Sequence, residues 1–104
     1  MEKRAVQRIP KCICIKFFSG TSLHSGIIMN LSEKGIFINT KMSFPLKSKL
    51  EILLPLKEDI LKVHGMIKNI RKTGKIYNGI GVELLTPNKN YLKLISNLKT
   101  SYYS

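Results

Sequence analysis

Apolar residues alternate with polar ones in several short segments, and residues that favour turns separate these segments. In residues 12–18, the apolar side chains Ile13, Ile15 and Phe17 alternate with Cys14 and Lys16. A period of two predicts a strand with one buried face. Further segments of this kind are rich in β-branched or apolar residues and cover 23–32, 36–39, 49–54, 60–71 and 76–85. Six short strands separated by turns indicate an antiparallel β-barrel.

The second predicted turn contains Gly35, directly before the segment 36–39. Because a short hairpin loop often needs a positive φ, we expect Gly35 to adopt one. Strict alternation in 23–32 predicts two opposite faces, with Ile27, Met29 and Leu31 on one, and Ile28, Asn30 and Ser32 on the other. We expect the small polar side chains of Asn30 and Ser32 to project outward.

Beyond residue 87 the apolar spacing changes from two residues to three or four. This spacing predicts an amphipathic helix over residues 88–102, with Asn88 or Thr86 as its N-cap. The apolar positions of this helix are Tyr91, Leu94, Ile95, Leu98 and Tyr102. We expect the helix to cover an open end or face of the barrel.

The 104 residues suffice for one hydrophobic core, so we expect a single domain. Residues 1–10 are polar and basic and end at Pro10, and we expect them to form a flexible N-terminal arm before a barrel over 11–85. No apolar run approaches the roughly 20 residues that cross a bilayer, and no signal peptide is recognisable. The expected location is therefore the cytoplasm.

Reactive side chains are not arranged for catalysis or metal binding. The 6 acidic residues are scattered, and no nucleophile sits in a Gly-x-Ser-x-Gly elbow. Cys12, Cys14, His24 and His64 are four possible metal ligands, but they lack the spacing of a zinc finger. Cys12 and Cys14 lie near the distance limit for a disulfide within one strand, so we expect buried or half-buried free thiols. No catalytic residue, metal or cofactor is predicted.

Positive charge dominates the chain, with 18 Lys and Arg against 6 Asp and Glu and a net charge of +12. Such an excess favours an anionic partner. Only three of the basic residues are arginines, and Arg4 and Arg8 fall within the arm. A guanidinium fork grips phosphate oxygens or a guanine edge in a bidentate manner, which an ammonium group does not. The lysines are dispersed, as expected of charges that solvate a surface.

Two short motifs point to a ligand class. Residues 4–8 read R-x-x-x-R, and residues 30–35 read N-x-S-x-x-G with Asn30, Ser32 and Gly35. In this order and spacing the chain resembles the PilZ domain family, which are receptors for bacterial cyclic di-GMP. The resemblance continues through 63–67, 79–84 and the C-terminal helix. It implies a six-stranded antiparallel β-barrel whose N-terminal arm closes over a ligand on one outer face.

The resemblance also implies roles for individual residues. Arg4 and Arg8 would hold the guanine and phosphate groups of cyclic di-GMP, while Asn30, Ser32 and Gly35 would line the opposite side. Lys3 is a further candidate for a second phosphate or a second ligand molecule. The family more often carries Asp where this chain has Asn30, so a somewhat weaker grip on guanine is expected.

The leading hypothesis is a non-catalytic cyclic di-GMP receptor that signals to a protein partner through its ordered arm, as in motility or biofilm regulation. One alternative is a PilZ-like adaptor that contacts proteins without using the nucleotide. A second is a small basic nucleic-acid-binding barrel. That class stacks bases on grouped aromatic residues, and the aromatic residues of this chain show no obvious grouping.

Overall fold

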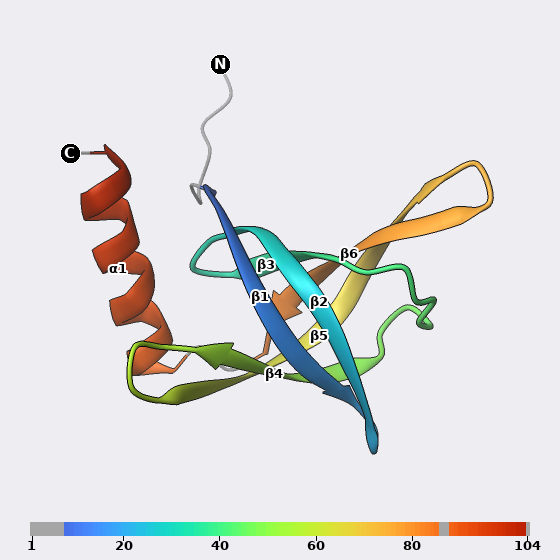
Figure 1. Ribbon diagram of the computed structural model, residues 1–104, viewed down its shortest axis with the longest axis horizontal. Helices are drawn as coiled ribbons and strands as arrows, with labels where there is room; N and C mark the ends of the chain where they lie inside the picture. The colour runs from blue at the N-terminus through green and yellow to red at the C-terminus, as the bar shows by residue number, and fades with distance from the viewer. Residues whose placement is uncertain (1–7, 86–87, 104) are drawn as a thin grey trace.

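The chain folds into a closed barrel of six antiparallel strands followed by one helix (Figure 1). The computed structural model describes residues 8–85 and 88–103. The elements are β1 (Ile9–Ser19), β2 (Ser22–Leu31), β3 (Gly35–Asn39), β4 (Lys49–Pro55), β5 (Ile60–Thr73), β6 (Ile76–Leu84) and α1 (Lys89–Tyr103). Their order around the barrel is β1-β2-β3-β6-β5-β4, and pairing of β1 with β4 closes it. The predicted fold class is confirmed.

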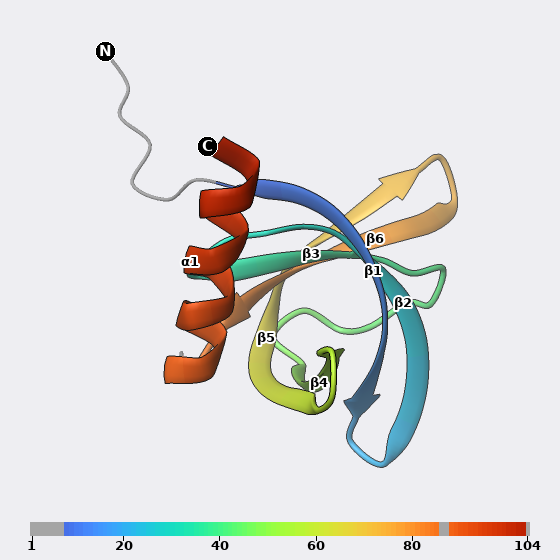
Figure 2. The same cartoon turned by 60° about the vertical axis from the view of Figure 1, so that its left-hand side comes forward.

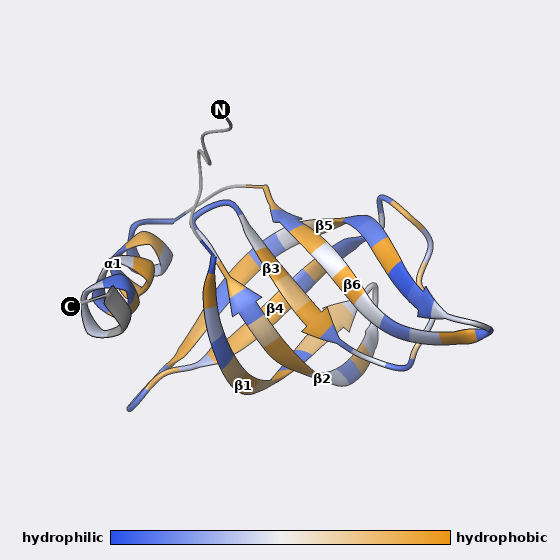
Figure 3. Cartoon of the chain, turned by 90° about the horizontal axis from the view of Figure 1, so that it is seen from above, coloured by the Kyte–Doolittle hydropathy of each residue, from blue (hydrophilic) through white to orange (hydrophobic). Residues whose placement is uncertain are grey.

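The barrel interior is filled by the apolar residues of the alternating pattern. Bands of hydrophobic and hydrophilic residues alternate along the strands in Figure 3, as expected when successive side chains point to opposite faces. Side chains from all six strands are almost fully buried there, among them Phe17, Ile28, Ile38, Ile52, Ile67 and Ile80. The core therefore holds the strands in a fixed register, and the side chains on the outer face of the barrel are not needed to fill it.

Strand β2 departs from the strict alternation predicted for it. Ile28 and Leu31 are both fully buried, whereas Ile27 is 41% exposed. The register with β3 shifts between Ile28 and Asn30, so a bulge at Met29 inserts one residue. The predicted faces were wrong for this reason, because the bulge turns Leu31 inward with Ile28 and leaves Asn30 on the outer face.

Helix α1 covers the barrel end where β1 begins and the β2–β3 loop lies (Figure 2). Tyr91 and Ile95 are fully buried in the core cluster. The side-chain oxygen of Asn88 accepts a hydrogen bond of 2.6 Å from the backbone N–H of Tyr91, which caps the helix. Asn88, one of the two predicted caps, therefore starts α1.

Three local predictions were wrong. Ile9 and Pro10 belong to β1 and not to the arm, because Ile9 is buried in the core. In the described part of the chain, positive φ angles occur at Gly20, Lys47 and Gly74 but not at Gly35. The two cysteines are exposed free thiols and not buried ones, since both point away from the core.

The two histidines lie in different surroundings. His24 stacks on Phe17 and meets the edge of Phe44, whereas His64 faces Glu51 at 3.4 Å. Within residues 8–85 and 88–103, no group of three or more His, Cys, Asp or Glu side chains is placed to hold a metal ion. No helix in the same ranges is long and apolar enough to cross a membrane.

Candidate functional site

An open pocket of about 520 Å³ lies on the outer face of the barrel. This volume falls within the roughly 300–1,000 Å³ of small-molecule sites. Strands β2, β3, β6 and β5, the β2–β3 loop and the residue before β1 supply its lining, which consists of Arg8, Asn30, Ser32, Lys34, Gly35, Phe37, Lys68, Asn69, Arg71, Gly81, Val82 and Glu83. Four of the predicted site residues are thus brought together here.

The two sequence motifs meet through a direct hydrogen bond. Arg8 donates from Nη1 to the Oδ1 atom of Asn30 at 2.8 Å, although the two residues are 22 positions apart. Arg8 directly precedes β1, and β1 pairs with β2 near Asn30, so the barrel register brings the guanidinium over this strand. Arg4 and Lys3, the remaining predicted site residues, lie outside the described residues.

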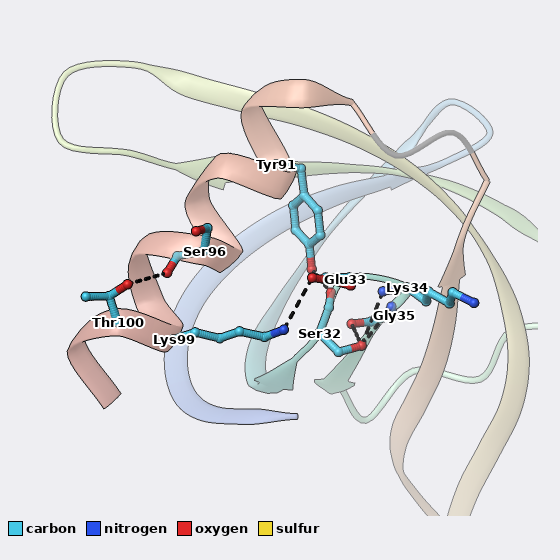
Figure 4. A network of polar contacts seen from close by, with 8 residues as sticks. All are labelled: Ser32, Glu33, Lys34, Gly35, Tyr91, Ser96, Lys99 and Thr100. Atoms are coloured by element: carbon cyan, nitrogen blue, oxygen red, sulfur yellow. Dashed lines mark hydrogen bonds and ion pairs between the residues drawn. The ribbon is translucent and has the colours of Figure 1, made fainter. Parts of the chain in front are cut away.

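Ser32 shapes the β2–β3 loop from within. Its side chain was predicted to project outward, but Ser32 is only 2% exposed. Its hydroxyl oxygen accepts hydrogen bonds from the N–H groups of Lys34 and Gly35 at 3.3 and 3.2 Å, and lies 3.3 Å from the Gly35 carbonyl that it donates to (Figure 4). Because the hydroxyl closes the loop in this way, Gly35 needs no positive φ. The serine therefore borders the pocket as a structural residue.

Gly35 is required by close packing instead. A Cβ atom at this position would lie 3.0 Å from the carbonyl oxygen of Val82 and 3.5 Å from Nη2 of Arg8. A side chain here would press on the backbone of β6 and come into van der Waals contact with the arginine. The glycine therefore lets a ligand approach the loop beside Arg8.

The loop is fastened to α1 at two points (Figure 4). The buried hydroxyl of Tyr91 donates to the carbonyl of Ser32 at 2.7 Å, and Lys99 pairs with Glu33 at 3.3 Å. Burial raises the pKa of the Tyr91 hydroxyl, and the charge of Arg8 opposes this rise more weakly. The phenol therefore stays a protonated donor at neutral pH. A displacement of the β2–β3 loop would therefore change or break these two contacts with α1.

The half of the pocket formed by β5 and β6 was missed by the sequence reasoning. It contains Phe37, Asn69 and Arg71, and the guanidinium of Arg71 lies 4.4 Å from the centre of the Phe37 ring. One signal was available, because Arg71 is the third of the chain's three arginines and the other two stand in the R-x-x-x-R motif. The residues around Arg71 could not be predicted from the sequence, since they depend on the pairing of strands that are distant in the chain.

The pocket carries an excess of positive charge. Four of its lining residues are basic, namely Arg8, Lys34, Lys68 and Arg71, and Glu83 is its one acidic lining residue in the described chain. Lys68 and Glu83 pair at 3.5 Å on the exposed surface, where such a pair is worth little. The remaining positive charge suits a ligand with phosphate groups.

Replacing Ser32 by alanine is expected to lower the free energy of unfolding by roughly 1–3 kcal/mol, because the buried N–H of Gly35 loses its hydrogen-bond acceptor. Urea denaturation followed by circular dichroism measures this change. Ser22→Ala, at an exposed position, is the matched control and should change stability by less than about 0.5 kcal/mol. Equal stability of the Ser32 variant and the unaltered protein would contradict the structural role.

Comparison with known proteins identifies the fold. The PilZ domain family matches residues 2–100. Among solved structures, the motility inhibitor MotI/DgrA of Bacillus subtilis has a TM-score of 0.80 at 13% identity, and the alignment covers 97% of this chain and 52% of that one. The PilZ domain of YcgR from Escherichia coli with c-di-GMP has a TM-score of 0.74 at 12% identity, with coverage of 98% and 92%.

The MrkH–c-di-GMP complex of K. pneumonia has a TM-score of 0.73 at 11% identity, with coverage of 97% of this chain and 52% of that chain. The chain thus spans about half the length of MotI/DgrA and MrkH. No curated protein matches the sequence. At these identities the structural neighbours establish a shared fold.

Proposed function

Because this chain belongs to the PilZ domain family, we propose that it is a receptor for cyclic di-GMP and that the nucleotide binds in the pocket over β2, β3, β6 and β5. The hydrogen bond between Arg8 and Asn30 is the observation that supports this most directly. It unites the two sequence motifs at one pocket. Two of the structurally similar proteins were solved with c-di-GMP, and both have this barrel.

The chemistry of the described residues suits this ligand. The guanidinium of Arg8 offers planar donors for a phosphate or for the O6 and N7 atoms of guanine. The amide of Asn30 offers an acceptor for guanine N1–H or N2–H and does so without a charge. Gly35 leaves the loop backbone open to a flat base beside both residues. By the motif, Arg4 adds a second guanidinium, and Lys3 is a further candidate.

Ordering of the N-terminal segment over the bound nucleotide is the proposed output. The ligand would fix residues 1–8 above the pocket and so change the surface presented to a protein partner. Since α1 is fastened to the ligand-binding loop by Tyr91 and Lys99, the helix is a second route for the signal. The likeness of the fold to a motility inhibitor supports motility as one process to examine. No catalytic step and no cofactor belong to this mechanism.

Hydrogen exchange is expected to detect the ordering of the arm. Amides of residues 1–8 should exchange more slowly in the presence of saturating cyclic di-GMP than in its absence, because a polar segment gains partners when the anion binds. Mass spectrometry of N-terminal peptides measures the difference, and peptides from β4 serve as the internal control. Equal exchange with and without the nucleotide would reject the proposed ordering of the arm, but it would not contradict the proposal that the protein binds cyclic di-GMP.

Titration calorimetry with cyclic di-GMP tests the proposed function. We expect a dissociation constant of the order of 1 μM that depends only weakly on salt, since few charges face the doubly charged ligand. A short single-stranded oligonucleotide, titrated in the same salt series, should bind weakly and lose affinity steeply as counterions are released. Tight oligonucleotide binding near physiological salt without cyclic di-GMP binding would support the nucleic-acid barrel. Binding of neither would support the protein adaptor.

A further inference from the structure

A row of four laterally paired residues crosses the pocket from β2 to β5. Asn30 pairs with Phe37, Phe37 with Gly81, and Gly81 with Asn69. All four line the pocket, so they lie on the outer face of the barrel. With neighbouring strands roughly 4.8 Å apart, the two asparagines at the ends of the row are about 14 Å apart along the sheet. The site thus has two distant amides on one surface.

Two glycines of β6 form the floor between the ends of this row. A Cβ atom at Gly81 would collide with the side-chain amide of Asn69, and one at Gly79 would collide with the ring of Phe37. The amide and the ring therefore lie directly on the backbone of β6. Side chains in this position are supported from below, and their free faces are turned to the pocket.

Arg71 completes the β5 end of the pocket. It pairs with Gly79 across the sheet, and its guanidinium lies over the Phe37 ring at 4.4 Å from the ring centre. This cation–π contact with the ring favours a position of the guanidinium above Phe37. Arg71 is itself exposed, so the face of the guanidinium turned away from Phe37 is open to a flat ligand group.

The two ends of the pocket have matching chemistry. At the β2 end an amide, Asn30, is held by a guanidinium, Arg8. At the β5 end an amide, Asn69, and a second guanidinium, Arg71, both line the pocket. A cyclic dinucleotide has two bases joined through a rigid phosphate ring, so both of its ends present a purine. A surface with one amide–guanidinium pair would recognise only one of them.

We propose that Asn69 and Arg71 form a second base site, which reads the other guanine of cyclic di-GMP. The Asn69 amide hydrogen-bonds the guanine edge, and the purine stacks on the guanidinium that Phe37 supports. This inference rests on the proposed function and adds to it, because it assigns recognition to residues outside both motifs. It accounts for the positions of Gly79 and Gly81, which the motifs leave unexplained.

The mixed cyclic dinucleotide that carries one guanine and one adenine tests this inference against cyclic di-GMP. The unaltered protein should bind cyclic di-GMP about tenfold more tightly, because the mixed ligand can satisfy only one end. In Asn69→Ala this preference should fall to about twofold or less. Gly81→Ala should act similarly with little loss of stability, because its methyl group displaces only the flexible amide of Asn69.

Matched controls separate recognition from general effects. Asn97→Ala on the exposed surface of α1 should keep the full preference for cyclic di-GMP. Arg71→Ala should weaken binding of both ligands about tenfold. Lys72→Ala should have less than a twofold effect, because the ammonium group of Lys72 lies over Tyr77 and not over Phe37. Thermal unfolding of each variant establishes that the barrel is intact.

Three results would overturn the inference in distinguishable ways. An unchanged preference in Asn69→Ala, together with weakened binding in Arg8→Ala, would reject the second base site and leave the proposed function standing. Equal effects of Arg71→Ala and Lys72→Ala on ligand binding would show that Arg71 contributes only its positive charge and does not stack on a base. If the unaltered protein binds no cyclic dinucleotide, the proposed function fails and the second base site fails with it.

Discussion

Substitution of Arg8 by alanine is expected to weaken cyclic di-GMP binding about tenfold to a hundredfold, which corresponds to roughly 1–3 kcal/mol. The change removes the planar donors that face the pocket and also the hydrogen bond that holds the amide of Asn30 at 2.8 Å. Because Arg8 is exposed and precedes β1, the barrel should remain folded. Titration calorimetry gives the affinity, and thermal unfolding gives the stability.

The lysine variant separates charge from geometry. Arg8→Lys keeps the positive charge but not the bidentate fork, so it should recover only part of the lost affinity. Lys11→Ala, at an exposed position of β1 outside the pocket, is the matched control and should leave binding nearly unchanged. By the motif, Arg4→Ala should resemble Arg8→Ala. Unchanged affinity in the double Arg4 and Arg8 variant would reject the arginine motif as the ligand grip.

The architecture could be predicted because each strand repeats the same local signal. Along a strand, side chains that point into the barrel alternate with side chains that point outward, and the inward ones must be apolar. The buried positions of residues such as Phe17 and Ile52 can therefore be inferred from the pattern of their neighbours in the sequence. The strands, the helix and Asn88 as one of two candidate caps are therefore recognisable from the sequence alone. The bulge at Met29 was not, because it depends on how β2 pairs with β3.

Only the motif half of the candidate site could be predicted from the sequence. Arg8, Asn30, Ser32 and Gly35 lie in two short motifs, and the structure places all four at one pocket. The buried role of Ser32 escaped prediction, since it depends on hydrogen bonds within the loop.

The other half of the pocket depends on long-range register. Asn69 is opposite Gly81, and Gly81 is opposite Phe37, across strands that are far apart in the sequence. No local pattern along β3, β5 or β6 predicts that these residues share a face. A sequence motif marks only the residues that are close together in the chain, whereas a binding surface on a barrel also uses residues that the strand order brings together.

Replacement of Tyr91 by alanine is expected to lower the free energy of unfolding by about 3–5 kcal/mol, the range for deleting a large aromatic side chain from a core. Tyr91 is fully buried where α1 covers the end of the barrel, and its hydroxyl donates to the carbonyl of Ser32 at 2.7 Å. Small domains have only about 5–15 kcal/mol in total, so this loss would unfold a large part of the population on mild heating. Urea denaturation measures it, with Lys93→Ala on the exposed side of α1 as the control.

The conservative variant Tyr91→Phe separates packing from hydrogen bonding. It keeps the ring but deprives the Ser32 carbonyl of its donor, so we expect a smaller loss of about 1–2 kcal/mol. It also removes the direct hydrogen bond between the helix and the β2–β3 loop, while Lys99 and Glu33 still connect them. If α1 transmits the signal, cyclic di-GMP should slow hydrogen exchange in α1 less in Tyr91→Phe than in the unaltered protein. An identical ligand effect on α1 in both proteins would show that the helix stabilises the barrel without relaying the bound state, and the arm would then be the sole proposed output.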